Sequence, residues 1–225
     1  MGTDQFSQVY EACMYLLELQ NPYRRDELLA FAASRPTADG SIEPAVTGHK
    51  YFSRADYTAH TKHDYLFTVK ASSARTLASE SLSYSNLKGR HLGDGVTFLY
   101  RTGKEYNDIF AALDWQRLPG ITAEAKAFES VTSSTHSYES TKSQKVGGVS
   151  LDGNGATAME LIRDTLSAKK TWFMFDDGIV CLGADIDCET DNDIYTSVNQ
   201  CLSVGDAKYA LADGSKGVLT FGEEE

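Results

Sequence analysis

The chain has 225 residues, of which 41% are hydrophobic and 11% aromatic, so it can bury a substantial core and is not an intrinsically disordered protein. Its formal net charge is −11, from 32 acidic and 21 basic residues. An overall field of this sign does not attract a polyanion such as nucleic acid or an acidic polysaccharide, although local basic patches could still bind one. No apolar run approaches the ~20 residues of a membrane span, and the N-terminal segment lacks the basic start and small-residue cleavage site of a signal peptide.

The first 33 residues predict a helical segment. Thr3 is a suitable N-cap, and a second helix is expected from Pro22 to Phe31 with Asn21 as its cap. Two short amphipathic helices cannot bury their apolar faces alone, so they indicate a hairpin docked on something else or the end of a larger helical array. The apolar residues at helical spacing in the first helix are Phe6, Val9, Tyr10, Cys13, Leu16 and Leu17.

Residues 34–47 are rich in proline and glycine and predict a linker. From residue 48 to 225 the apolar period changes to two, and the turn signals Asp152-Gly153, Asp177-Gly178 and Asp213-Gly214 separate short runs. Short strands without intervening helices predict a mainly β fold, a large antiparallel β-sandwich preceded by a short helical hairpin. The expected strands are Asp64–Ala71, Val96–Tyr100, Gly147–Leu151, Thr157–Ile162, Thr171–Phe175, Ile179–Leu182, Tyr195–Leu202, Tyr209–Ala212 and Val218–Phe221.

A polar stretch, Arg75 to Gly95, stands between two of these strands and carries a lone glutamate, Glu80. Polar residues held between strands are typical of a loop that a sheet keeps rigid to present a binding site. Two other segments interrupt the strand pattern: 105–121 is expected to be an ordered loop, and 124–145, which is rich in Ser, Thr, Glu and Lys, is expected to be mobile.

The remaining polar residues favour structural roles. Cys188 and Cys201 flank an expected hairpin and could form a disulfide, but buried free thiols are favoured for all four cysteines. The five histidines show no metal spacing, and we expect neither a metal nor a cofactor. Acids at every second position from Asp185 to Asp193 could hold a divalent cation, although a solvated acidic face is the favoured interpretation.

A set of short motifs, in order and at matching spacing over roughly residues 48 to 205, resembles polysaccharide lyase family 8, specifically the central β-supersandwich domain of chondroitin and hyaluronan lyases, closest to the chondroitin ABC type. The motifs are Tyr51-Phe52-Ser53-Arg54-Ala55-Asp56-Tyr57, His60, Ser73-Ala74-Arg75-Thr76, Glu80-Ser81, Asn86-Leu87-Lys88-Gly89, His91-Leu92-Gly93-Asp94-Gly95, Asp114-Trp115, Leu118-Pro119-Gly120, Gly147-Gly148-Val149-Ser150, Lys170-Thr171-Trp172-Phe173 and Asp176-Asp177-Gly178-Ile179-Val180-Cys181-Leu182-Gly183.

The chain also departs from the family pattern. Where members usually carry an asparagine and a second glutamate between Glu80 and Asn86, it has Ser83 and Ser85. Arg90 replaces a usual tryptophan, and His60-Thr61-Lys62 replaces a usual His-Arg-Arg. These differences imply a retained scaffold with altered sugar contacts.

The resemblance implies a supersandwich, mutarotase-like fold and β-elimination on uronate-containing polysaccharides such as chondroitin or hyaluronan, by a secreted or periplasmic enzyme. The family's base and acid residues belong to an N-terminal α/α-toroid of several hundred residues, and the two expected helices are similar to its last pair. The chain alone is therefore expected to be inactive and to need that domain as a partner.

By the same resemblance, Glu80 aligns with the family's active-site glutamate, which would orient a catalytic group of the toroid. The expected substrate-binding residues around it are Arg75, Ser83, Asn86, Lys88, His91 and Trp115.

For most of these residues a structural role is an open alternative. Arg75 could form an ordinary ion pair, for example with Glu80. Asn86 and Lys88 are common turn residues. His91 could be a hydrogen-bonded structural histidine, and Trp172 is expected in the core.

Two other functions stay open. One is a carbohydrate-binding or structural β-sandwich with no catalytic role. The other is a mutarotase-like enzyme, which would need a His/Glu pair across a sheet, and the sequence identifies no such pair.

Overall fold

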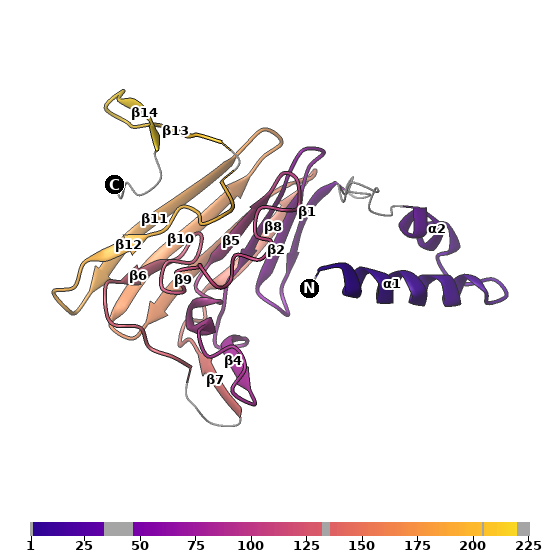
Figure 1. The fold of residues 1–225 in the computed structure, drawn as a ribbon, viewed down its shortest axis with the longest axis horizontal. Helices are drawn as coiled ribbons and strands as arrows, with labels where there is room; N and C mark the ends of the chain where they lie inside the picture. The colour runs from indigo at the N-terminus through magenta and orange to yellow at the C-terminus, as the bar shows by residue number, and fades with distance from the viewer. Residues whose placement is uncertain (1, 34–46, 132–135, 204, 220–225) are drawn as a thin grey trace.

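The computed structural model describes residues 2–33, 47–131, 136–203 and 205–219, and it is mainly β with two N-terminal helices (Figure 1). The expected linker, 34–47, lies outside the described residues except for Thr47. Among the described residues, no helix combines the length and the apolarity that crossing a membrane requires.

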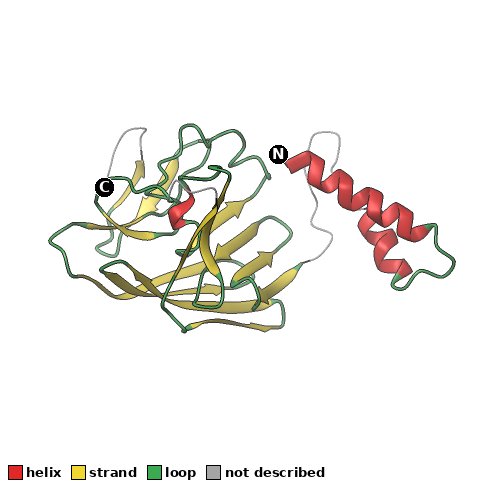
Figure 2. Cartoon of the chain, turned by 90° about the horizontal axis from the view of Figure 1, so that it is seen from below, coloured by secondary structure: helices red, strands yellow, loops and turns green. Residues whose placement is uncertain are grey.

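The helices α1 (Gly2–Leu17) and α2 (Arg25–Ala33) pack on each other as a hairpin (Figure 2). The second helix begins at Arg25, not at Pro22 as predicted, because Asn21 and Arg24 adopt left-handed backbone angles, φ 55° and 62°, that a helix cannot include. No residue of α2 is buried. In α1, Cys13 is the one buried residue among the side chains that the structure describes. The pair thus leaves apolar side chains uncovered: Val9, Met14, Tyr15, Leu16, Leu19, Tyr23 and Leu29.

Two four-stranded antiparallel sheets form the body of the β region (Figure 1). Sheet I has the order β1-β2-β3-β5, from Gly48–Phe52, Tyr57–Thr61, Leu66–Lys70 and Val96–Tyr100. Sheet II has the order β11-β10-β9-β8, from Ile179–Cys188, Leu166–Met174, Asn154–Arg163 and Val146–Leu151.

Three two-stranded sheets complete the described fold. They pair β4 (Leu77–Leu82) with β7 (His136–Ser140), β6 (Thr122–Glu124) with β12 (Ile194–Thr196), and β13 (Ala207–Ala210) with β14 (Lys216–Leu219). A single 3-10 turn, η1 (Gly89–His91), follows β4.

The main core lies between sheets I and II. On β10 every second residue is buried, as period-two alternation requires, and Trp172 is 1% exposed as the sequence predicts. Thr58 and Thr157 join the sheets through a buried hydroxyl contact of 2.6 Å. The buried cluster consists of Phe67, Val69, Ala71, Met159, Leu161, Leu166, Ala168, Trp172 and Met174.

Several segments differ from the sequence-based expectation. The expected strand Tyr195–Leu202 ends at Thr196, and the segment expected to be mobile, 124–145, contains β7. The sequence of β7 has no apolar period. The strand is fixed by hydrogen-bonded pairing with β4, which an apolar pattern does not reveal. The partner strand β4 is itself part of the stretch that was expected to be a loop, so Glu80 lies on a strand.

The acidic alternation after Asp185 is broken by a bulge. The register of β10 with β11 shifts between Ser167 and Lys169, and Asp185 has a left-handed φ of 49°. Its carboxylate accepts a hydrogen bond of 2.5 Å from Lys169. Within the ranges that the structure describes, no group of three or more His, Cys, Asp or Glu side chains could hold a metal ion.

All four cysteines are free thiols. Only Cys13 is buried, whereas burial was expected for all of them; Cys181 and Cys201 are exposed.

Two buried histidines lie at the interface of the sheets, with ring centroids 5.8 Å apart. His49 Nδ1 lies 2.7 Å from Ser150 Oγ, and His60 Nε2 donates to the Phe175 carbonyl at 3.0 Å. Burial lowers the pKa of both rings below the ordinary value, and for His49 the positive charges of His60 and Lys62 lower it further.

We therefore expect the free energy of unfolding to fall as the pH is lowered from about 8 to about 5.5. The pKa of both histidines in the folded chain lies below the ordinary 6.5, so on acidification the unfolded chain binds protons before the folded chain does. The stability that neutral histidines contribute is therefore complete above pH 6.5 and is lost as the pH falls below it. Urea unfolding across this range measures the effect. His60→Gln should flatten the response, whereas the exposed His63→Gln control should keep it; an unchanged response in His60→Gln would contradict the assignment.

Candidate functional site

The stretch Arg75–Gly95 connects the end of β3 at Lys70 to the start of β5 at Val96, at one end of sheet I. It forms β4, a tight turn and η1, and the β4–β7 pair extends beyond the large sheets (Figure 1). Its two flanking strands are hydrogen-bonded to each other, so both ends of the stretch are fixed by the same sheet.

The turn after β4 folds back on the strand. Ser85 N–H donates to the Leu82 carbonyl at 3.0 Å, and Ser81 Oγ donates to the Ser85 carbonyl at 2.6 Å. Asn86 Nδ2 donates to the Glu80 carbonyl at 3.2 Å. These bonds hold the polar residues of the turn beside the outward face of β4.

Three of the residues predicted to form the site lie on β4 and in the turn that follows it. Glu80, Ser83 and Asn86 are all exposed, and Lys88 is exposed immediately before η1. A Cβ at Gly89 would lie 2.5 Å from the Asn86 side-chain oxygen, so a larger residue there would displace the Asn86 side chain. The turn therefore presents a carboxylate, an amide and an ammonium group to solvent on a hydrogen-bonded frame.

A buried carboxylate, Asp94, fixes the C-terminal end of the stretch. It is 1% exposed and accepts hydrogen bonds from Arg163 Nε at 3.0 Å and Arg163 Nη2 at 2.5 Å. His91 Nδ1 lies 2.8 Å from the same carboxylate. Burial alone would raise the pKa of Asp94, but the His91 hydrogen bond and the Arg163 charge hold it below its ordinary value.

His91 thus has a structural partner. Its ring is buried and bonded to Asp94, so this geometry supports positioning of the loop and gives no support for direct sugar contact.

An outer ion network ties the same segment to the β9–β10 turn. Arg90 Nη2 lies 2.8 Å from Asp164, and Lys126 Nζ lies 2.7 Å from the same carboxylate. Arg90 also pairs with Glu129. Arg90 therefore anchors the turn through charge.

A second buried carboxylate, Asp56, fixes the N-terminal end. It is fully buried and accepts hydrogen bonds from Tyr51 Oη at 2.8 Å, Ser73 Oγ at 2.5 Å and Thr76 Oγ1 at 2.8 Å. Burial would raise the pKa of Asp56, but these hydroxyl donors and the Arg75 charge lower it overall. Burial and the Asp56 hydrogen bond raise the pKa of Tyr51 to about 12.

Arg75 pairs with Asp56, at 2.8 Å from Nη2 to Oδ1. The sequence left open a pairing with Glu80, but the arginine pairs with a buried acid in the turn between β1 and β2 instead. Its side chain stays 52% exposed, so one side of the guanidinium faces solvent.

Trp115 packs beside the smaller core cluster that contains Val96 and Leu118. Its Nε1 donates to the Phe110 carbonyl at 3.3 Å, which holds the ring in the loop before β6. Trp115 is therefore partly buried against the β domain and is not brought into the turn that carries Glu80.

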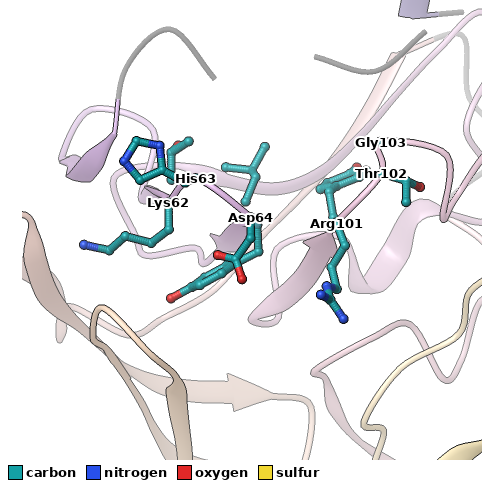
Figure 3. Close-up of a pocket in the computed structure, with 10 residues that line it drawn as sticks. Lys62, His63, Asp64, Arg101, Thr102 and Gly103 are labelled. Atoms are coloured by element: carbon teal, nitrogen blue, oxygen red, sulfur yellow. The ribbon is translucent and has the colours of Figure 1, made fainter. Parts of the chain in front are cut away.

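The hollow in Figure 3, about 280 Å³ in volume, is separate from this site. It is lined by residues such as Lys62, Leu66 and Tyr100, at the opposite end of β3 and β5 from Lys70 and Val96. Lys62 is already engaged, by Asp176 at 2.5 Å and by the Gly153 carbonyl at 3.0 Å.

The sequence reasoning missed the residues that support the site, Asp56, Asp94 and Arg163. Asp56 and Asp94 belong to the motifs Tyr51–Tyr57 and His91–Gly95, but a motif does not reveal which carboxylate is buried. Arg163 carried no local signal, since it binds Asp94 from a distant strand.

Comparison with known proteins assigns the β region. Residues 47–224 match the model of polysaccharide lyase family 8, super-sandwich domain. The chain is 34% identical to a chondroitinase AC of Pedobacter heparinus over 91% of this chain and 29% of that protein. It is 30% identical to a hyaluronate lyase of Thermasporomyces composti over 82% of this chain and 25% of that protein.

Solved structures agree. A chondroitinase AC lyase studied as oligosaccharide complexes superimposes with a TM-score of 0.75 at 33% identity, over 93% of this chain and 30% of that one. A chondroitin AC lyase of Streptomyces coelicolor A3 in complex with chondroitin sulphate gives a TM-score of 0.65 at 30% identity, over 78% of this chain and 24% of that one. The chain thus spans less than a third of the relatives it matches.

We expect Asp94→Asn to destabilise the fold by about 3–5 kcal/mol, because it leaves the Arg163 guanidinium buried without its counter-charge. The matched control is Asp185→Asn, which removes an exposed ion pair to Lys169 and should cost less than about 1 kcal/mol. Urea unfolding measures both. Equal losses in the two variants would show that Asp94 does not fix the stretch.

Proposed function

The chain belongs to polysaccharide lyase family 8. From this membership we propose that its β region forms one wall of the substrate cleft of an enzyme that cleaves uronate-containing glycosaminoglycans by β-elimination. The observation that carries the proposal is the exposed Glu80 turn, held between two buried aspartates in the domain that matches the family.

β-Elimination needs three groups around the sugar. The uronate carboxylate must be neutralised, the C5 proton abstracted, and the leaving glycosidic oxygen protonated. Along Arg75–Gly95, whose residues are all described, the exposed side chains supply a carboxylate, an amide and cations. They offer no exposed histidine, since His91 is buried.

We therefore assign Glu80 a positioning role. Its carboxylate would accept a hydrogen bond from a tyrosine, arginine or histidine of a helical α/α-toroid domain and orient that group toward the sugar. Asn86 and Lys88 would contact the polysaccharide from the same turn, with Arg75 further along the stretch. Without the toroid, the chain would bind sugar but would not cleave it.

The helical pair is compatible with this partner. Cys13, Leu16, Leu19, Leu28 and Phe31 line a hollow of about 740 Å³ between the helices. An apolar hollow on a small hairpin is the surface that further helices would cover. This supports the expectation that α1 and α2 belong to a larger helical domain.

The substrate class rests on the relatives. A chondroitinase AC and hyaluronate lyases are among them, and so is a xanthan lyase of a Bacillus species, 33% identical over 72% of this chain. We propose a chondroitin- or hyaluronan-type polymer, which the chain would meet outside the cell or in the periplasm.

One observation favours a second candidate, a non-catalytic carbohydrate-binding sandwich. Ser83 and Ser85 stand where the family usually carries asparagine and glutamate, and Ser85 Oγ is used inside the turn by the Leu82 carbonyl. In that case Glu80 would be an ordinary solvent-facing acid.

The two candidates differ in what Glu80→Gln does. We expect the chain alone to bind a chondroitin tetrasaccharide in calorimetry without forming unsaturated uronate. Supplied with a family toroid domain in trans, it should give elimination products, and Glu80→Gln should lower that rate at least ~100-fold while changing binding by less than about twofold.

Asp187→Asn is the control, since it removes an equally exposed acid on β11. Full activity of Glu80→Gln would favour the non-catalytic candidate, and robust cleavage by the chain alone would contradict the proposed need for a toroid.

A further inference from the structure

The tip of the turn after β4 carries two exposed apolar side chains. Leu82 is 57% and Tyr84 is 55% exposed. On β4, Leu82 lies on the same outward face as Glu80, because alternate strand residues share a face and both are exposed. An exposed aliphatic side chain therefore shares a face with the carboxylate that the proposed function assigns to the cleft, and an exposed aromatic side chain follows it in the turn.

Packing does not explain the tyrosine. Both Ser83 and Tyr84 adopt left-handed backbone angles, φ 51° and 64°, which are uncommon for non-glycine residues and a genuine outlier for a bulky one. Glycine or asparagine would adopt this conformation at less cost. The ring thus occupies a strained position without the burial that would repay the strain.

The rest of the turn is occupied internally. The hydroxyls of Ser81 and Ser85 both donate to carbonyls within the turn, and the Asn86 amide donates to the Glu80 carbonyl. Tyr84 is the largest outward group that these contacts leave available between Glu80 and Asn86.

Tyrosine suits a pyranose in this setting. Its ring packs against the C–H face of a sugar and its hydroxyl donates a hydrogen bond, at little cost in side-chain entropy. A neutral ring also adds contact without adding charge, which matters for an acidic polymer approaching a chain of net charge −11.

We propose that Tyr84 is a sugar-stacking residue, binding the pyranose next to the one at Glu80. The inference rests on the proposed function of the same turn. It makes Tyr84 a substrate-binding residue and assigns it no part in proton transfer.

The test compares affinity with stability in the full chain. Calorimetric titration with a chondroitin tetrasaccharide should show Tyr84→Ala binding about tenfold more weakly, with Tyr84→Phe and Tyr84→Trp within about threefold of the parent. Tyr23→Ala, which removes another exposed tyrosine, should bind as the parent does.

Tyr84→Asn separates recognition from structure. It should keep or raise the thermal midpoint, because asparagine tolerates the left-handed angle, and yet bind as weakly as Tyr84→Ala. A loss of stability together with binding would overturn the inference, because the ring would then support the fold.

The remaining outcomes also decide. If the parent chain binds the tetrasaccharide and Tyr84→Ala binds it with the same affinity, the stacking role is rejected while the proposed function stands. Absence of any tetrasaccharide binding by the parent would reject the proposed function, and the inference with it.

Discussion

Two buried carboxylates hold the stretch Arg75–Gly95 in place. Asp56 and Asp94 lie at its two ends, and each is surrounded by donors that offset the cost of removing a charge from water. Arg75 and Arg163 supply the counter-charges. Because each pair joins the stretch to a strand or a strand turn, the position of the turn between them follows from the stacking of the two large sheets.

This arrangement separates support from presentation. The carboxylates that fix the stretch are buried, whereas Glu80, Tyr84 and Lys88 are exposed and form no part of the core. If the proposed function holds, substitution at the turn would change sugar recognition without loss of the fold.

The sequence predicted what depends on local pattern. Burial of Trp172 followed from alternation, and Asp177-Gly178 marked the turn between β10 and β11. What it missed depends on partners distant in the chain. Strand β4 is polar and exists through pairing with β7, and Asp94 is a structural acid because Arg163 reaches it from β9. The family motifs identified the domain but could not show which acid is exposed. The expected chondroitin ABC subtype stays a prediction.

A crystal structure of the chain with a bound chondroitin tetrasaccharide tests the central claim most directly. The account predicts sugar density across the turn from Glu80 to Lys88, with one pyranose ring against Tyr84. Density confined to the hollow beside Lys62 and Arg101, with the turn unoccupied, would contradict it.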